Sequence, residues 1–113
     1  MQFKKLWRLL CGGLHVGNVI PRWTRDSGFL DNPIFITKLR PWAIEITTPS
    51  VRRSISIPRE DFEKVWALWK SYLQGRVSRR EIRNLTRHSA YIISILYSVQ
   101  VFWLGGFTPN TAE

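Results

Sequence analysis

Three short apolar-rich runs lie in the second quarter of the chain, at residues 34–39, 42–47 and 51–57, and apolar and polar side chains alternate in the second and third. Short proline-containing or polar segments separate the runs. In the middle run the apolar positions of one parity are Trp42, Ile44 and Ile46. The third run keeps this pattern except at Arg53. A period of two predicts strands with one buried face, and short connections predict antiparallel neighbours.

From Pro58 onward the spacing changes to that of helices. Apolar residues recur every three or four positions, at Phe62, Val65, Trp66, Trp69 and Leu73. This stripe predicts an amphipathic helix that begins near Pro58 and stops at Gly75. Ser78 and Glu81 have the spacing of a capping box, which predicts a second helix. A third helix is expected from residues 88–89, with Ser89 as its cap.

The order of these elements predicts an α+β fold: an antiparallel sheet of three to four strands, followed by and packed against three helices. A fourth strand is expected at residues 19–23, where Pro21 favours an edge position. The expected organisation is a single domain over 1–113. Its parts are an N-terminal arm and edge strand (1–32), antiparallel strands (33–57), a three-helix segment (58–104) and a tail (105–113). The beginning of the arm is expected to be a short amphipathic helix or an extended segment docked on the domain. The helical stripe should pack on the isoleucines of the strands, Ile34, Ile36, Ile44, Ile46, Ile55 and Ile57.

The chain is strongly basic, with 17 Lys and Arg against 8 Asp and Glu and a formal net charge of +9. Such an excess favours an acidic partner, which can be nucleic acid, an anionic membrane surface or an acidic protein. The alternative is that the charge only keeps the protein soluble.

Residues 78–96, about a sixth of the chain, resemble a helix-turn-helix motif. The matching positions are Ser78, Glu81, Ile82, Leu85, Ser89, Ile93 and Leu96. The resemblance implies that the start of the third helix, including Ala90, faces a groove or a single strand of nucleic acid. Two positions depart from the motif: Arg83 stands where a small residue is usual, and Arg87 stands where the turn usually has glycine.

Arginines are concentrated in the same segment, at the three- and four-residue spacing of one helix side: Arg76, Arg79, Arg80, Arg83 and Arg87. A stripe of guanidinium groups can neutralise phosphates and bind them bidentately. His88 and Tyr91, next along the chain, are candidates for contact with bases. The alternative is a solvated helix face whose arginines pair with Glu60, Asp61 or Glu63.

The leading hypothesis is therefore a non-enzymatic nucleic-acid-binding protein, with a regulatory role and a homodimer as further expectations. One alternative is a protein-interaction or self-assembling module that uses the apolar run at residues 97–107. That run is also interpreted as core. Another alternative is a small-molecule binder with a tryptophan-lined pocket between sheet and helices.

Catalysis has little support in the residues present. Cys11, His15 and His88 are the soft ligands of the chain, which is too few for a zinc cluster, so no metal and no cofactor are expected. Cys11 and His15 are one helical turn apart, but two glycines lie between them. No run approaches the roughly 20 apolar residues of a membrane span. A lone cysteine fits a reducing compartment, and we expect the cytoplasm.

Overall fold

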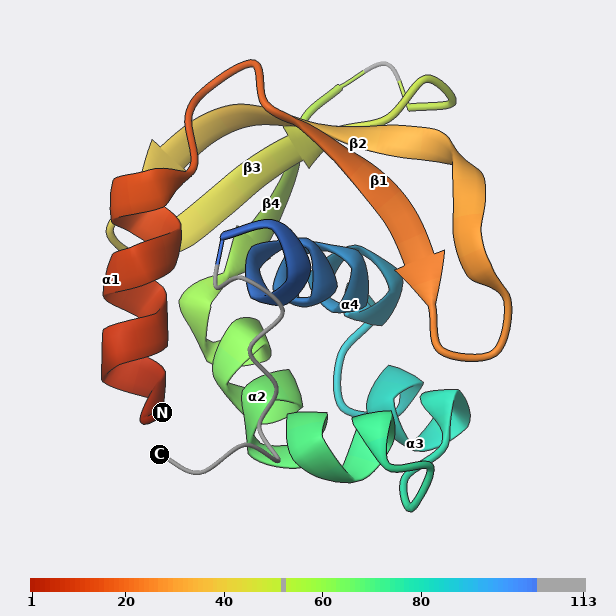
Figure 1. Cartoon of the computed structure of the whole chain (residues 1–113). Coiled ribbons are helices and arrows are strands. Elements are labelled where there is room, and N and C mark those ends of the chain that lie inside the picture. Colours follow the sequence, from red (N-terminus) through yellow and green to blue (C-terminus); the bar gives the residue numbers. More distant parts are fainter. Residues whose placement is uncertain (52, 104–113) are drawn as a thin grey trace.

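The computed structural model describes residues 1–51 and 53–103. The chain forms a helix, four strands and then further helices (Figure 1). In order, these are α1 (Phe3–Gly13), β1 (Val19–Thr24), β2 (Gly28–Arg40), β3 (Ala43–Thr47), β4 (Ile55–Pro58), α2 (Arg59–Leu73), α3 (Arg79–Arg83), α4 (Ser89–Ser98) and the π-helix η1 (Val99–Trp103). The fold is α+β and forms one small domain, as the patterns predict.

The four strands form one antiparallel sheet in the order β1-β2-β3-β4, the predicted meander. Its register places apolar residues opposite one another: Ile20 with Ile34, Ile36 with Ile46, and Ile44 with Ile57. Strand β1 is an edge strand, and its pairing with β2 shifts register around Pro21. Proline lacks a backbone N–H, so an irregular position on an edge strand accommodates it without losing a ladder hydrogen bond.

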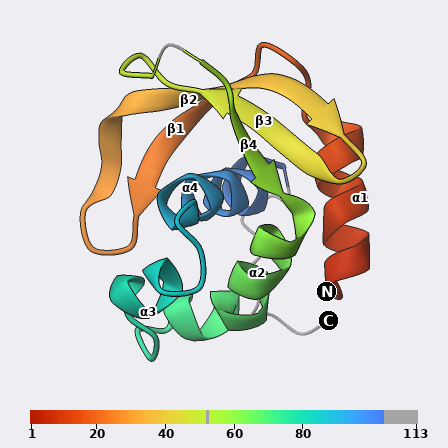
Figure 2. The ribbon, with the colours of Figure 1, turned by 180° about the vertical axis from the view of Figure 1, so that it is seen from behind.

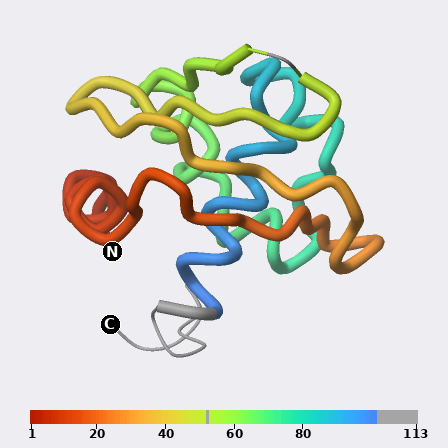
Figure 3. Tube along the Cα trace, turned by 90° about the horizontal axis from the view of Figure 1, so that it is seen from above, coloured from red at the N-terminus to blue at the C-terminus, as the bar shows by residue number. Residues whose placement is uncertain are grey.

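Helix α4 lies beneath the sheet at the centre of the molecule, with α2 below it and α1 beside it (Figure 1). Seen from above, the strands cross over α4 while α1 is viewed nearly end-on (Figure 3). The helix is apolar around most of its circumference, and its buried residues include Ile92, Ile93, Ile95 and Leu96. A helix that is apolar on all sides is stable only when it is surrounded by protein, which explains its position.

The predicted apolar stripe of α2 packs into the same core as the isoleucines of the strands. Phe62, Val65 and Trp69 are buried, and Tyr72 joins them. Trp66 and Leu73 lie at the margin of the core and are partly buried. Trp69 donates a hydrogen bond from Nε1 to Gln100 Oε1 at 2.9 Å, so its single polar atom is satisfied inside the core.

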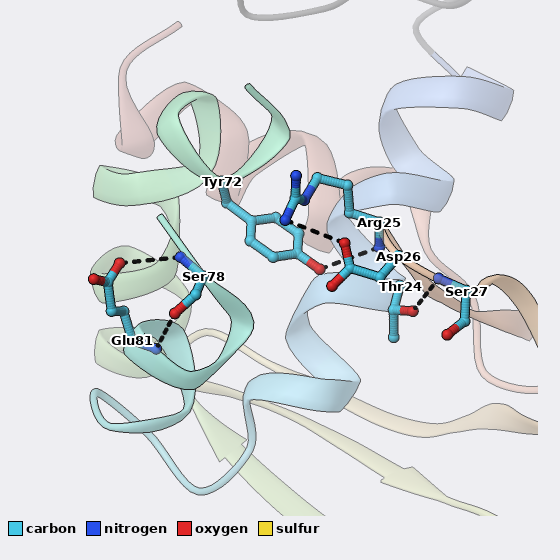
Figure 4. Close-up of polar contacts among 7 residues, drawn as sticks. All are labelled: Thr24, Arg25, Asp26, Ser27, Tyr72, Ser78 and Glu81. Atoms are coloured by element: carbon cyan, nitrogen blue, oxygen red, sulfur yellow. Dashed lines mark hydrogen bonds and ion pairs between the residues drawn. The ribbon is translucent and has the colours of Figure 1, made fainter. Parts of the chain in front are cut away.

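Helix α3 begins with the predicted capping box (Figure 4). The Glu81 N–H donates to Ser78 Oγ at 3.2 Å, and the Ser78 N–H donates to Glu81 Oε2 at 3.0 Å. Nearby, the β1–β2 turn is tied to the end of α2, because the backbone N–H of Arg25 donates to the hydroxyl of Tyr72 at 3.2 Å (Figure 4).

The first residues form the amphipathic helix α1, one of the two forms expected for the beginning of the arm. Several other element boundaries differ from the predictions. Strand β2 starts at Gly28, inside the segment assigned to the arm, because Gly28 adopts a φ of 69° that closes the tight β1–β2 turn. Trp42 is 62% exposed and not in a strand, since it occupies the β2–β3 turn. Strand β4 starts only at Ile55, and α4 begins at Ser89 with His88, not Ser89, as its N-cap.

Part of the C-terminal prediction falls on residues 104–113, which lie outside the described residues. Within the described part of that run, Val99 is buried. The ring of Tyr97 stacks on Trp23 with a centroid distance of 3.6 Å. The beginning of the run is therefore core. Over residues 1–51 and 53–103, no helix combines the length and apolarity needed to cross a membrane.

Candidate nucleic-acid interface

The predicted arginine stripe is divided among three segments of the chain. Arg76 precedes α3, Arg79, Arg80 and Arg83 lie on it, and Arg87 follows it in the turn to α4. Helix α3 is only five residues long. The five arginines therefore do not form one continuous stripe on a single helix side, as their spacing predicts.

These arginines are accessible to a ligand. Arg76, Arg80, Arg83 and Arg87 are exposed, whereas Arg79 is half-buried and its Nε has no hydrogen-bond partner. In the described part of the chain, the ion pairs join other residues, Arg25 with Asp26 and Arg40 with Glu45. Among the described residues, therefore, no acid of α2 forms an ion pair with these arginines.

A groove of about 580 Å³ lies between β4 and the start of α4. Figure 2 shows the turn that follows α3 rising toward the sheet near β4. The groove is lined by Arg53, Ser54, Ile55, Ser56, Arg87, His88 and Tyr91. It therefore brings together three of the predicted site residues, Arg87, His88 and Tyr91, and adds a second arginine from the strand side. The other four predicted arginines are outside its lining.

The turn that carries Arg87 is anchored to the first turn of α2. The Thr86 hydroxyl donates to Asp61 Oδ2 at 2.8 Å, and the backbone N–H of His88 donates to Thr86 Oγ1 at 3.0 Å. The His88 carbonyl then accepts the N–H of Ile92 at 3.1 Å and starts α4. These contacts fix the backbone on both sides of Arg87 while its side chain stays exposed.

His88 is 8% exposed at the floor of the groove. Burial lowers the pKa of its imidazole from the ordinary value; the nearby Asp61 carboxylate opposes that shift, and the Arg87 charge adds to it. The pKa is therefore low enough that the ring is neutral at pH 7, and one ring nitrogen carries a proton to donate. Among the described residues, the ring makes no hydrogen bond of its own.

Tyr91 is held from one side by Arg22 of β1. The guanidinium carbon lies 5.0 Å from the centre of the Tyr91 ring, a cation–π distance. Arg22 Nε is buried without a hydrogen-bond partner. The contact orients Tyr91 at the groove and adds a third positive charge behind the ring.

In a helix-turn-helix protein the recognition helix lies in the major groove and its N-terminal residues contact the base edges. Helix α4, the counterpart in residues 78–96, is buried beneath the sheet, so only its first turn reaches the groove.

Sequence reasoning did not include the strand side of the groove, Arg53, Ser54 and Ser56. Arg53 could have been noticed in the sequence, because it stands at a position of the third run where the pattern expects an apolar residue. A charged side chain on the apolar parity of a strand indicates a position that faces something other than core.

Neither a metal-binding cluster nor similarity to other proteins assigns a function to this site. Within residues 1–51 and 53–103, no group of three His, Cys, Asp or Glu side chains could hold a metal ion. Comparisons of the chain with protein families, with curated proteins and with solved structures found no match.

Proposed function

We propose that this protein binds nucleic acid through the groove between β4 and α4 and catalyses no reaction on it. The observation that carries the proposal is that Arg53 and Arg87, from distant parts of the chain, line one groove without an acidic partner among the described residues. Two cations that share a groove leave an uncompensated positive potential, which a phosphate backbone neutralises.

The groove offers donors that suit a phosphodiester. Arg53 and Arg87 supply bidentate guanidinium groups, and Ser56 supplies a hydroxyl at the groove wall, whereas the Ser54 hydroxyl shares a hydrogen bond with Thr37 Oγ1 at 3.0 Å. The neutral ring of His88 contributes one N–H donor. Tyr91 presents an aromatic ring on which an unpaired base can stack.

The exposed arginines of α3 extend this surface. Arg80 and Arg83 lie on the same short helix and point to solvent. They provide further phosphate contacts for a strand that leaves the groove. Because backbone contacts dominate and no helix enters a groove of the duplex, we expect little sequence preference.

Binding of the purified protein to labelled single-stranded and duplex DNA and RNA tests the proposal, by fluorescence anisotropy over a salt series. We expect affinity to fall steeply as salt rises, because phosphate binding releases condensed counterions. In Arg53→Ala/Arg87→Ala the slope of log affinity against log salt should fall by roughly 0.7–0.9 for each phosphate that the variant no longer neutralises. The matched control is Lys4→Ala/Lys5→Ala, which removes the same charge from exposed positions on α1.

Absence of binding to every nucleic acid at low salt would refute the proposal. Equal reductions of affinity in the groove variant and in the α1 control would show that net charge alone attracts the ligand. An unchanged affinity in Arg80→Ala/Arg83→Ala would restrict the interface to the groove.

A cytoplasmic location and pairing of two copies belong to the same proposal. A dimer would double the number of phosphate contacts and raise affinity through the effective concentration of the second site. Sedimentation of the same samples over a range of protein concentrations measures the oligomeric state.

A further inference from the structure

A second hollow lies on the other side of the molecule, between α1 and the end of β2. It has a volume of about 410 Å³ and is lined by Trp7, Arg8, Cys11, Leu39, Arg40 and Pro41. It is mainly apolar, and its size is within the range of small-molecule sites. None of its lining residues belongs to the groove proposed to bind nucleic acid.

Two polar groups of its walls, on Trp7 and Arg40, are bonded within the protein. Trp7 Nε1 donates to the carbonyl of Pro41 at 2.9 Å, and the indole itself is only 6% exposed. Arg40 Nε donates to Glu45 Oε2 at 2.6 Å, so an acid of the same chain balances its charge. The Cys11 thiol makes only a long contact of 4.0 Å to the carbonyl of Arg40.

Among the described residues that line this pocket, Arg8 carries a charge that no ion pair compensates. It is exposed on α1, and no ion pair or hydrogen bond of its side chain occurs among the described residues. Lys4 lies one helical turn earlier, is also exposed, and adds to the positive potential of that face. Burial raises the pKa of the Cys11 thiol, and the Arg59 charge opposes the shift only in part, so the thiol adds no negative charge at neutral pH.

We propose that this pocket binds a small molecule with an apolar body and one anionic group, the chemical class of a medium-chain carboxylate. The apolar body lies against the half-buried Leu39 and the exposed Pro41 and displaces water from them. The anionic group lies at the rim, where the Arg8 guanidinium binds it. The inference does not depend on nucleic-acid binding.

Cys11 gives a direct readout, because it is the only cysteine of the chain and lines the pocket. The experiment follows alkylation of the native protein by iodoacetamide, with decanoate as the probe below its micelle concentration. At about ten times the dissociation constant, decanoate should slow alkylation by about tenfold, because only the free protein reacts. Shorter carboxylates should protect less, and decyltrimethylammonium, whose charge is opposite, should not protect.

The charge contact is tested by Arg8→Gln. This variant should weaken decanoate binding by roughly twofold to fivefold, the range of an exposed ion pair, and leave binding of the neutral decanol unchanged. The matched control Lys4→Gln removes the same charge one turn away and should keep most of the affinity. Calorimetric titration of decanoate gives the same comparison without the thiol.

Three results would overturn the inference. The first is an alkylation rate that decanoate does not change. The second is equal protection by decanoate and decanol in both the wild type and Arg8→Gln, which would remove the anionic group from the ligand class. The third is protection only by vesicles that contain an anionic phospholipid, which would make this face a membrane-docking surface.

Discussion

The two hollows of the molecule differ in how far the polar side chains of their walls are paired within the protein. In the pocket beside α1, the indole N–H of Trp7 and the guanidinium of Arg40 are bonded within the protein. In the groove beside α4, Arg53 and Arg87 have no acidic partner among the described residues. Apart from Arg8 at its rim, the pocket has satisfied polar groups and favours an apolar body with one anionic group, whereas a wall with two unpaired cations favours a polyanion. Net charge alone therefore does not assign a ligand to a surface.

The first turn of α2 joins these two regions. Asp61 accepts the hydroxyl of Thr86 at 2.8 Å and supports the turn that borders the groove. The next residue, Phe62, is fully buried, and its ring lies 5.4 Å from that of Trp7 in the wall of the pocket. Changes at this turn therefore act on both regions, while changes at either wall act on one.

Substitution of Phe62 should have the greatest effect on stability. Phe62→Ala removes a fully buried ring and should lower the free energy of unfolding by about 3–5 kcal/mol, because apolar burial decreases and a cavity forms. Urea unfolding followed by circular dichroism measures the decrease. The exposed neighbour provides the control, since Glu63→Ala should change stability by no more than about 0.5 kcal/mol. A decrease below about 1 kcal/mol in Phe62→Ala would contradict the packing of α2 against α1.

A smaller effect, confined to the pocket side, is expected at Trp7. Trp7→Phe keeps an aromatic ring but removes the hydrogen bond from Nε1 to Pro41, at a cost of about 0.5–1.5 kcal/mol, to which the lost volume of this buried side chain adds. The matched variant is Trp42→Phe, at an indole that is 62% exposed, and it should leave the urea midpoint nearly unchanged. Equal shifts in the two variants would show that the bond does not hold the β2–β3 turn against α1.

The parts of the fold that periodicity predicted are those with a strong local pattern. The isoleucines of β2, β3 and β4 and the α2 stripe fall in the core because one-sided burial imposes a period on each element separately. The capping box at Ser78 and Glu81 was also predictable, because it needs only two residues three positions apart. Boundaries such as Gly28 depend on the φ of one residue in a turn and leave a weaker trace in the sequence.

The groove was predicted only on its helix side, for a physical reason. Arg87, His88 and Tyr91 are close in sequence, and their charge and aromatic character can be read locally. Arg53 joins them only because the sheet and the α3–α4 turn bring residues far apart in the chain together. Local spacing also predicted one long arginine stripe, since it could not reveal that α3 ends at Arg83. Long-range contact therefore creates the site, whereas local pattern supplies its residues.

The smallest effect on stability is expected at His88. This effect depends on pH and belongs to the groove, not to the pocket. Burial lowers the pKa of its imidazole in the folded protein, so the folded state binds this proton less readily than the unfolded state, where the ordinary value is 6.5. The stability from neutral His88 is thus complete above about pH 6.5 and decreases as pH falls through the lowered folded value. In His88→Gln, the fall in unfolding free energy on acidification should be smaller than in the wild type, with the difference measured by urea unfolding across that range.

The Asp61 carboxylate provides a second test of this imidazole, because it opposes the shift that burial and the Arg87 charge produce. Asp61→Asn retains an oxygen that can accept the Thr86 hydroxyl but removes the charge, so the pKa of His88 should fall further below its ordinary value. The titration of the His88 ring protons by NMR measures both proteins. A phosphate bound between Arg53 and Arg87 should act in the opposite direction and raise this pKa, so that nucleic acid binds more tightly as the solution becomes mildly acidic. A His88 pKa at or above 6.5 in the free protein would contradict the buried, neutral imidazole at the floor of the groove.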